Sequence, residues 1–188
     1  MKFAIAVLVV LLLVGFGVGA QVKGIYNTLV TEREAINAAW SQVDVALQRR
    51  ADLIPNLVET VKGFAKQEQA VINSVTEARA AMMGARTPQE KIEAYGRMES
   101  ALGRLMVVVE NYPNIKSNEN FLRLQDELSG TENRIAVERR KYNETVQRYN
   151  TQIGLFPNNL VAGFFNFARN EAYFKTDPGA RNAPAVKF

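Results

Sequence analysis

The 188-residue sequence contains no cysteine and no histidine. It therefore cannot supply a thiol nucleophile, a disulfide, a thiolate or imidazole ligand for zinc, or a Ser-His triad. Phosphate relay through histidine is excluded for the same reason. Carboxylate chemistry remains open in principle, but the missing residue types predict a protein without enzymatic activity and without a cofactor. The absence of cysteine selects no redox compartment, because reducing and oxidising locations both accept such a chain.

The chain also lacks a low-complexity linker. Its six prolines and twelve glycines are scattered along the sequence. Length alone then favours a single folded domain with room for a sizeable core.

The longest apolar run lies at the N-terminus. Residues 3–20 contain no charge, and as a helix they would span about 27 Å, close to the hydrocarbon thickness of a bilayer. We predict a transmembrane anchor over residues 1–22. The competing interpretation is a cleaved signal peptide, with Lys2 as a minimal basic region and residues 18–20 as a loose cleavage site. The helical pattern continues directly beyond Val22, which favours a retained anchor.

The residues around the anchor bear on its orientation and association. Lys2 at one end nearly balances Lys23 and Arg33 at the other, so the positive charges do not decide on which side of the membrane the rest of the chain lies. Gly15 and Gly19 have the spacing that lets two membrane helices approach closely. In a segment rich in alanine, glycine and valine this spacing often arises by chance. The partners we expect are the lipid bilayer and further copies of the chain in a homo-oligomer.

Residues 23–155 contain four stretches with apolar side chains at alternating steps of three and four residues. Such a pattern is typical of long antiparallel helices that pack side by side. We predict an all-α fold, an up-and-down four-helix bundle preceded by one transmembrane helix. The apolar positions are Tyr26, Leu29, Ile36, Trp40, Val43 and Leu47, then Leu57, Val61, Phe64, Val71, Val75, Ala78 and Met82, then Ile92, Tyr95, Met98, Leu102, Leu105 and Val109, and finally Phe121, Leu124, Leu128, Ile135, Tyr142, Val146, Tyr149 and Ile153.

The clearest boundary separates the second stretch from the third. Residues 84–86 end the second helix. Thr87 can cap the third helix, Pro88 occupies the first helical position, where its missing N–H has no cost, and Glu90 can complete a capping box.

The boundary between the third and fourth stretches is less regular. Residues 111–114 stop the third helix, and Ser117 is the predicted N-cap of the fourth. Gly130 lies inside the fourth helix, where a glycine costs about 1 kcal/mol relative to alanine. Either a neighbouring helix approaches Gly130 closely or the helix bends there.

The connection between the first and second stretches depends on Asp52 and Pro55. A proline inside a helix loses a hydrogen bond and clashes with the preceding turn, whereas in the first turn it is tolerated. If Asp52 caps a new helix, a tight helical hairpin results; the alternative is one long kinked helix. We predict the hairpin, because four helices of comparable length close a bundle. The chain's C-terminal part would then return to the membrane, whereas a kinked helix would carry it away.

Residues 156–175 form the most aromatic part of the chain, with Phe164 and Phe165 on one side of a predicted short helix. Residues 139–188 hold 8 basic and 3 acidic side chains, against 15 and 16 in residues 1–138. This segment can lie in the headgroup region of a membrane or cover the open end of the bundle core. Residues 176–188 are predicted to be a disordered tail.

Three charged residues interrupt the apolar stripes and are the natural candidates for a site: Arg33, Glu68 and Glu138. A di-iron centre in a helical bundle needs Glu-x-x-His pairs, and carboxylates alone bind magnesium or calcium weakly. We interpret the three residues as members of buried or half-buried ion pairs that set the register of the helices, and we predict no metal site. The basic residues 139–141 lack interleaved aromatics, so we expect no nucleic-acid binding.

Several segments of the chain carry a distinctive combination of residues: 26–30 with Arg33-Glu34, 39–45, 48–63, 118–122, 130–137, Tyr142-Asn143 and Tyr149-Asn150. Together they resemble the LemA family of bacterial membrane proteins. The resemblance covers residues 26 to about 175, and one departure is Gln67, where the family commonly has histidine. It implies one N-terminal membrane helix, an up-and-down helical bundle and no established enzymatic activity, in a family whose relatives include a magnetosome membrane protein.

The expected function is that of a non-enzymatic scaffold, anchored by a single pass in the bacterial inner membrane. It would associate with itself or recruit other membrane or envelope proteins, which the sequence does not identify. Two alternatives remain open: a module that responds to a ligand or cation, and an exported soluble helical protein if the N-terminus is cleaved. The junction at Asp52 and Pro55 is expected to matter for shape and assembly.

Overall fold

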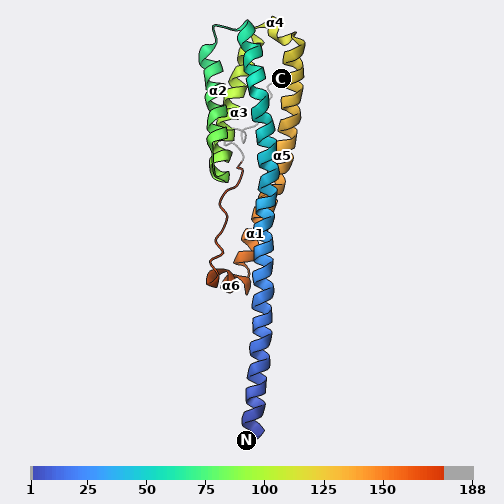
Figure 1. The fold of residues 1–188 in the computed structure, drawn as a ribbon, viewed down its shortest axis with the longest axis vertical. Coiled ribbons are helices and arrows are strands. Elements are labelled where there is room, and N and C mark those ends of the chain that lie inside the picture. Colours follow the sequence, from blue (N-terminus) through green and yellow to red (C-terminus); the bar gives the residue numbers. More distant parts are fainter. Residues whose placement is uncertain (1, 176–188) are drawn as a thin grey trace, which may run out of the picture. The chain divides into compact units, whose positions relative to one another are not determined.

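The computed structural model describes residues 2–175, so the predicted disordered tail over residues 176–188 lies outside the described part. All regular elements of the described residues are helices, which confirms the all-α prediction (Figure 1). They are α1 (Lys2–Phe64), α2 (Gln69–Gly84), α3 (Pro88–Glu110), α4 (Pro113–Lys116), α5 (Glu119–Gly154) and α6 (Asn158–Phe164).

Helix α1 runs without a break from Lys2 to Phe64, and Pro55 lies inside it. The prediction that Asp52 caps a new helix after a hairpin is therefore wrong. A proline has no N–H for the carbonyl four residues earlier, which here belongs to Ala51. Arg79 of α2 supplies the missing donor, because its Nε lies 2.8 Å from the Ala51 carbonyl oxygen.

The chain turns after α1, at residues 65–68, inside the stretch predicted to form one helix up to Met82. The Ala65 amide still donates to the Val61 carbonyl at 2.8 Å, and the Glu68 amide donates to the Ala65 carbonyl at 3.1 Å. This tight backbone turn contains neither glycine nor proline. The usual sequence signals of a turn are therefore missing at this place.

The other helix boundaries agree in part with the predictions. Helix α3 starts with the predicted capping box of Thr87 and Glu90, with Pro88 in its first turn. The N-cap of α5 is Asn118, whose Oδ1 accepts the Phe121 amide at 3.1 Å, so the prediction of Ser117 as this cap is wrong. Around Gly130 no other atom lies within 4 Å of the place of a Cβ, so no neighbouring helix approaches there.

The described chain forms two compact units, one of which comprises Trp40–Asn143 and the chain from Ala172. Its core is built from α1, α2, α3, α4 and α5. The large side chains that are almost completely buried there are Val43, Leu47, Ile54, Leu57, Ile72, Met98, Leu105, Ile115, Phe121, Ile135 and Tyr142. We call this part the polar-network unit.

The second unit comprises the chain up to Ala39 and Glu144–Glu171. We call it the apolar-helix unit. In it, the end of α5 and all of α6 lie beside α1 (Figure 1). Its buried apolar side chains are Leu29, Ile36, Val146, Tyr149, Ile153, Val161, Ala162 and Phe167. By length and composition, α1 contains a segment able to cross a membrane, and that segment is fully exposed in the unit.

The chain after α6 turns back sharply within the apolar-helix unit. Asn166 has a φ of 57°, in the left-handed region that asparagine adopts more readily than most residues. The Phe167 amide donates to the Ala162 carbonyl at 2.9 Å. This turn buries the ring of Phe167, while Phe164 stays exposed.

Candidate functional site

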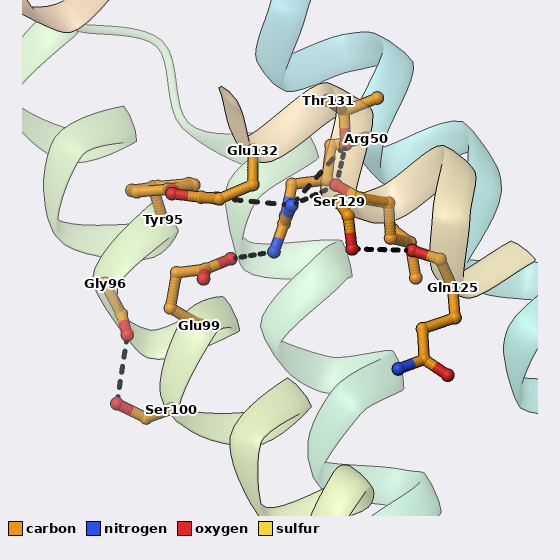
Figure 2. A network of polar contacts seen from close by, with 10 residues as sticks. Arg50, Tyr95, Gly96, Glu99, Ser100, Gln125, Ser129, Thr131 and Glu132 are labelled. Atoms are coloured by element: carbon orange, nitrogen blue, oxygen red, sulfur yellow. Dashed lines mark hydrogen bonds and ion pairs between the residues drawn. The ribbon is translucent and has the colours of Figure 1, made fainter. Parts of the chain in front are cut away.

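The most extensive polar network of the polar-network unit centres on Arg50 of α1 (Figure 2). Its side chain is only 7% exposed. One terminal nitrogen lies 2.6 Å from Glu99 of α3, and the other lies 3.2 Å from Glu132 of α5. Arg50 also donates to the Leu128 carbonyl at 3.0 Å. One guanidinium thus connects three helices.

The two carboxylates differ in their other partners. Glu132 accepts a hydrogen bond of 2.7 Å from the Tyr95 hydroxyl. Burial raises the pKa of Glu99, and the charge of Arg50 opposes this rise. Burial, with the nearby charge of Glu99, also raises the pKa of the Tyr95 phenol. Tyr95 is therefore a neutral hydrogen-bond donor at physiological pH, and it holds the Glu132 carboxylate in place.

A groove of about 450 Å³ opens beside this network. Arg50, Glu99 and Glu132 line it together with Gln125 and Met106. The two carboxylates are already engaged by one buried cation, and among residues 2–175 no group of three or more acidic side chains could hold a metal ion. The arrangement can orient helices, but it offers neither a nucleophile with a base nor a set of metal ligands.

The polar-network unit also holds the end of the described chain. The Asn143 side chain donates to the Phe174 carbonyl at 2.8 Å and accepts the Phe174 amide at 3.0 Å. The Phe174 ring stacks on Trp40, with ring centroids 6.2 Å apart. The Arg139 guanidinium lies 5.5 Å from the centre of the Tyr95 ring and 4.7 Å from the centre of the Phe174 ring. The side chain of one asparagine thus binds both backbone groups of one residue, as a residue of a neighbouring antiparallel strand does in a β-sheet.

The apolar-helix unit contains a second asparagine of this kind. Asn150 donates to the Asn170 carbonyl at 2.8 Å and accepts the Asn170 amide at 2.9 Å. The Tyr149 hydroxyl donates to the Ala168 carbonyl at 3.0 Å. These bonds fasten the segment that follows α6 to the end of α5.

Comparison with known proteins places the chain in a family. The profile of the LemA family matches residues 39–188. The chain belongs to the LemA family. This confirms the resemblance that the sequence motifs carry, which include both Tyr-Asn pairs of α5.

The relatives of this LemA family protein include two magnetosome proteins and a protein named LemA. Magnetosome protein MamQ 2 of Paramagnetospirillum magneticum is 31% identical, over 86% of this chain and 68% of the relative. Magnetosome protein MamQ of Magnetospirillum gryphiswaldense is 29% identical with the same coverage. Protein LemA of Metamycoplasma hominis is 25% identical, over 72% of this chain and 63% of the relative.

The charged residues that the sequence singled out in this LemA family protein have partners of their own. Glu68 accepts a hydrogen bond of 3.0 Å from the Tyr112 hydroxyl. Glu138 is buried, with Arg134 and Lys141 of its own helix each 3.2 Å away. Arg33 lies 5.3 Å from the centre of the Phe167 ring, as a cation over an aromatic face.

The remaining candidates are on surfaces or inside α1. Asp52 accepts a hydrogen bond of 2.9 Å from Gln48 one turn earlier. Gly15 and Gly19 have nothing within 4 Å of a Cβ position. Phe164 is 80% exposed, whereas Phe165 packs edge-on against Tyr26 at 4.9 Å.

Sequence reasoning missed Arg50, although its signal was present. Leu47, Arg50 and Ile54 continue the alternating steps of three and four residues, so Arg50 occupies a core position of the apolar stripe. The two Tyr-Asn pairs of α5 are seven residues apart. This spacing returns to the same helix face and indicates two repeated contacts, but it does not name the peptide units that the asparagines bind.

Proposed function

We propose that this LemA family protein is a non-enzymatic, single-pass membrane scaffold of the bacterial inner membrane, with an up-and-down four-helix bundle as its folded domain. The observation that carries this proposal is the course of α1. An exposed apolar segment at its start continues, in the same helix up to Phe64, into residues that are fully buried. A signal peptide that is removed has no need of such continuity.

The use of the polar side chains also supports a structural role. The buried charge of Arg50 is compensated by Glu99 and Glu132 from two other helices. Buried ion pairs with several partners favour one arrangement of helices over others more than they add stability. The names of the relatives, magnetosome protein and Protein LemA, designate no reaction.

Membrane attachment is tested on the full chain expressed in bacteria. Washing the membranes with alkaline carbonate should leave the protein in the pellet, and detergent should release it with an intact mass that includes residues 1–22. A mature chain that starts after residue 20, or release by carbonate alone, would overturn the anchor.

Self-association is tested in detergent by light scattering over a range of concentrations. We propose that Gly15 and Gly19 form the contact between anchors, since both are exposed in the apolar segment. Replacing both by leucine should lower the mass of the complex, because leucine keeps the helices apart. Gly17→Leu is the matched control, since Gly17 lies on a different face of the helix. A wild-type chain that is monomeric at all concentrations would remove this part of the proposal.

A further inference from the structure

The apolar-helix unit exposes large apolar side chains outside the apolar run of α1. Phe156 is 81% exposed, Leu160 63% and Phe164 80%. All three belong to α6 or to the turn just before it. Burying such side chains away from water is favourable. Three exposed side chains within nine residues therefore form an apolar surface suited to contact with an apolar environment.

Helix α6 is held firmly beside α1. The rings of Phe165 and Phe167 lie 4.9 and 5.6 Å from the Tyr26 ring. The segment after α6 is bound to α5 through both backbone groups of Asn170. Helix α6 therefore lies at a defined level of α1, within one compact unit (Figure 1).

That level is the end of the apolar run. Tyr26 lies four residues after Val22, the last residue of the uncharged run, and four residues of helix extend about 6 Å. The headgroup layer on each side of a bilayer is about 5 to 8 Å thick. Lys23, which is exposed, lies between Ala20 and Tyr26. A cationic residue followed by aromatic side chains is the usual composition of a membrane interface.

We propose that α6 and the preceding turn form a second membrane contact, with Phe156, Leu160 and Phe164 inserted at the boundary of headgroups and acyl chains. This inference rests on the proposed anchor and adds a second point of attachment to it. A lipid surface is favoured as the occupant because the exposed apolar side chains of α6 and the exposed apolar run of α1 belong to the same compact unit.

The test uses the full chain in vesicles of phosphatidylcholine and phosphatidylglycerol. The sequence has no cysteine, so a single introduced cysteine carries a nitroxide label at one known position. We would label Phe164→Cys in α6, Leu11→Cys in the apolar run and Gln147→Cys on an exposed position of α5. Collision of the label with oxygen, which concentrates in lipid, is compared with collision with a water-soluble nickel chelate.

The proposed contact predicts three different results. The Leu11→Cys label should collide with oxygen and not with nickel. In vesicles, the Phe164→Cys label should have much less access to nickel than the same label on a short peptide in water. The Gln147→Cys label should keep full access to nickel, because Gln147 lies seven residues before Gly154, the last residue of α5, and seven residues of helix extend about 10 Å.

The outcomes separate this contact from the anchor. If Leu11→Cys is in lipid while Phe164→Cys stays open to nickel, the second contact is wrong and the anchor stands. If Leu11→Cys is open to nickel, the anchor itself fails. If Phe164→Cys loses access to both oxygen and nickel, and spin-spin broadening grows with protein density, a protein surface covers α6 and the lipid contact is wrong. Leu160→Cys repeats the test at a second position, which guards against a local effect of one label.

Discussion

Arg79 donates a hydrogen bond of 2.8 Å to the carbonyl oxygen of Ala51, the carbonyl that Pro55 leaves without its helical partner. Ala51 is completely buried, so water cannot replace the missing amide. An unsatisfied buried carbonyl would cost about 1 to 3 kcal/mol. The side chain of a neighbouring helix thus makes a proline acceptable in the interior of α1 and at the same time joins α2 to α1.

This relationship predicts that the two residues depend on each other. Arg79→Met keeps an apolar stem but removes the donor, and it should lower the free energy of unfolding by about 1 to 3 kcal/mol. In a Pro55→Ala background the amide of residue 55 can bind the Ala51 carbonyl, so the same substitution should cost less than about 1 kcal/mol. The measurement is urea unfolding followed by far-UV circular dichroism in a non-ionic detergent.

The exposed Arg104 of α3 is the matched control, and Arg104→Met should change the free energy of unfolding by less than about 0.5 kcal/mol. An equal cost of Arg79→Met in both backgrounds would show that its donor does not serve the carbonyl left by Pro55.

Arg50 should be costly to remove alone and much less costly to remove together with its partners. Arg50→Met leaves two carboxylates without their shared cation and should lower the free energy of unfolding by about 3 kcal/mol. Adding Glu99→Gln and Glu132→Gln removes the uncompensated charges, so the triple variant should regain more than half of that loss. Arg50→Lys tests whether the planar guanidinium group is needed, because one ammonium cannot bind both carboxylates in the same geometry. A triple variant less stable than Arg50→Met would contradict this account.

Two glutamates of α3 should contribute to stability with opposite dependence on pH. Burial raises the pKa of Glu99 above its ordinary value of 4.5. Its contribution is therefore present below that pH and is lost as the pH rises through the raised pKa. Backbone hydrogen bonds from Arg86 and Thr87 lower the pKa of Glu90. Its contribution is present above pH 4.5 and is lost as the pH falls through the lowered pKa.

Glutamine variants test both signs. Glu99→Gln should weaken the fall in unfolding free energy on going from pH 4.5 upward, and Glu90→Gln should weaken the fall on acidification below that pH. Urea unfolding at a series of pH values provides the measurement. Slopes that change in the same direction for both variants would contradict the assignment.

The sequence predicted the helical class and the α3 cap because these depend on local patterns. It failed at Pro55 because the residue that compensates the proline, Arg79, is 28 residues away from Ala51. The sequence already indicated a continuous helix here, because the alternating steps of three and four residues run from Leu47 to Leu57 without interruption. Two separate helices joined by a hairpin would not need to continue one common spacing of apolar residues.

The candidate site was harder to predict than the fold. Glu68 and Glu138 were visible as polar interruptions of apolar stripes, but each engages a neighbour of its own. The Arg50 network depends on which helices lie side by side, and the misplaced turn at Asp52 assigned Arg50 to the end of a helix. The contact of Tyr26 with Phe165, which directly follows α6, joins residues more than 130 positions apart, which no local pattern indicates.

The binding of Phe174 by Asn143 can be followed through Trp40, which is the only tryptophan of the chain. Asn143→Ala removes both hydrogen bonds to the Phe174 backbone, which should release the ring that stacks on Trp40. Trp40 emission should then shift to longer wavelength, and quenching by acrylamide should increase, because water replaces the Phe174 ring. Phe174→Ala should give the same change without altering Asn143, since it removes the stacked ring directly. Gln147→Ala, an exposed change on the same helix, should leave the emission unchanged. If Asn143→Ala leaves Trp40 as it is while Phe174→Ala shifts it, the asparagine does not hold the segment, and ring packing alone keeps Phe174 in place.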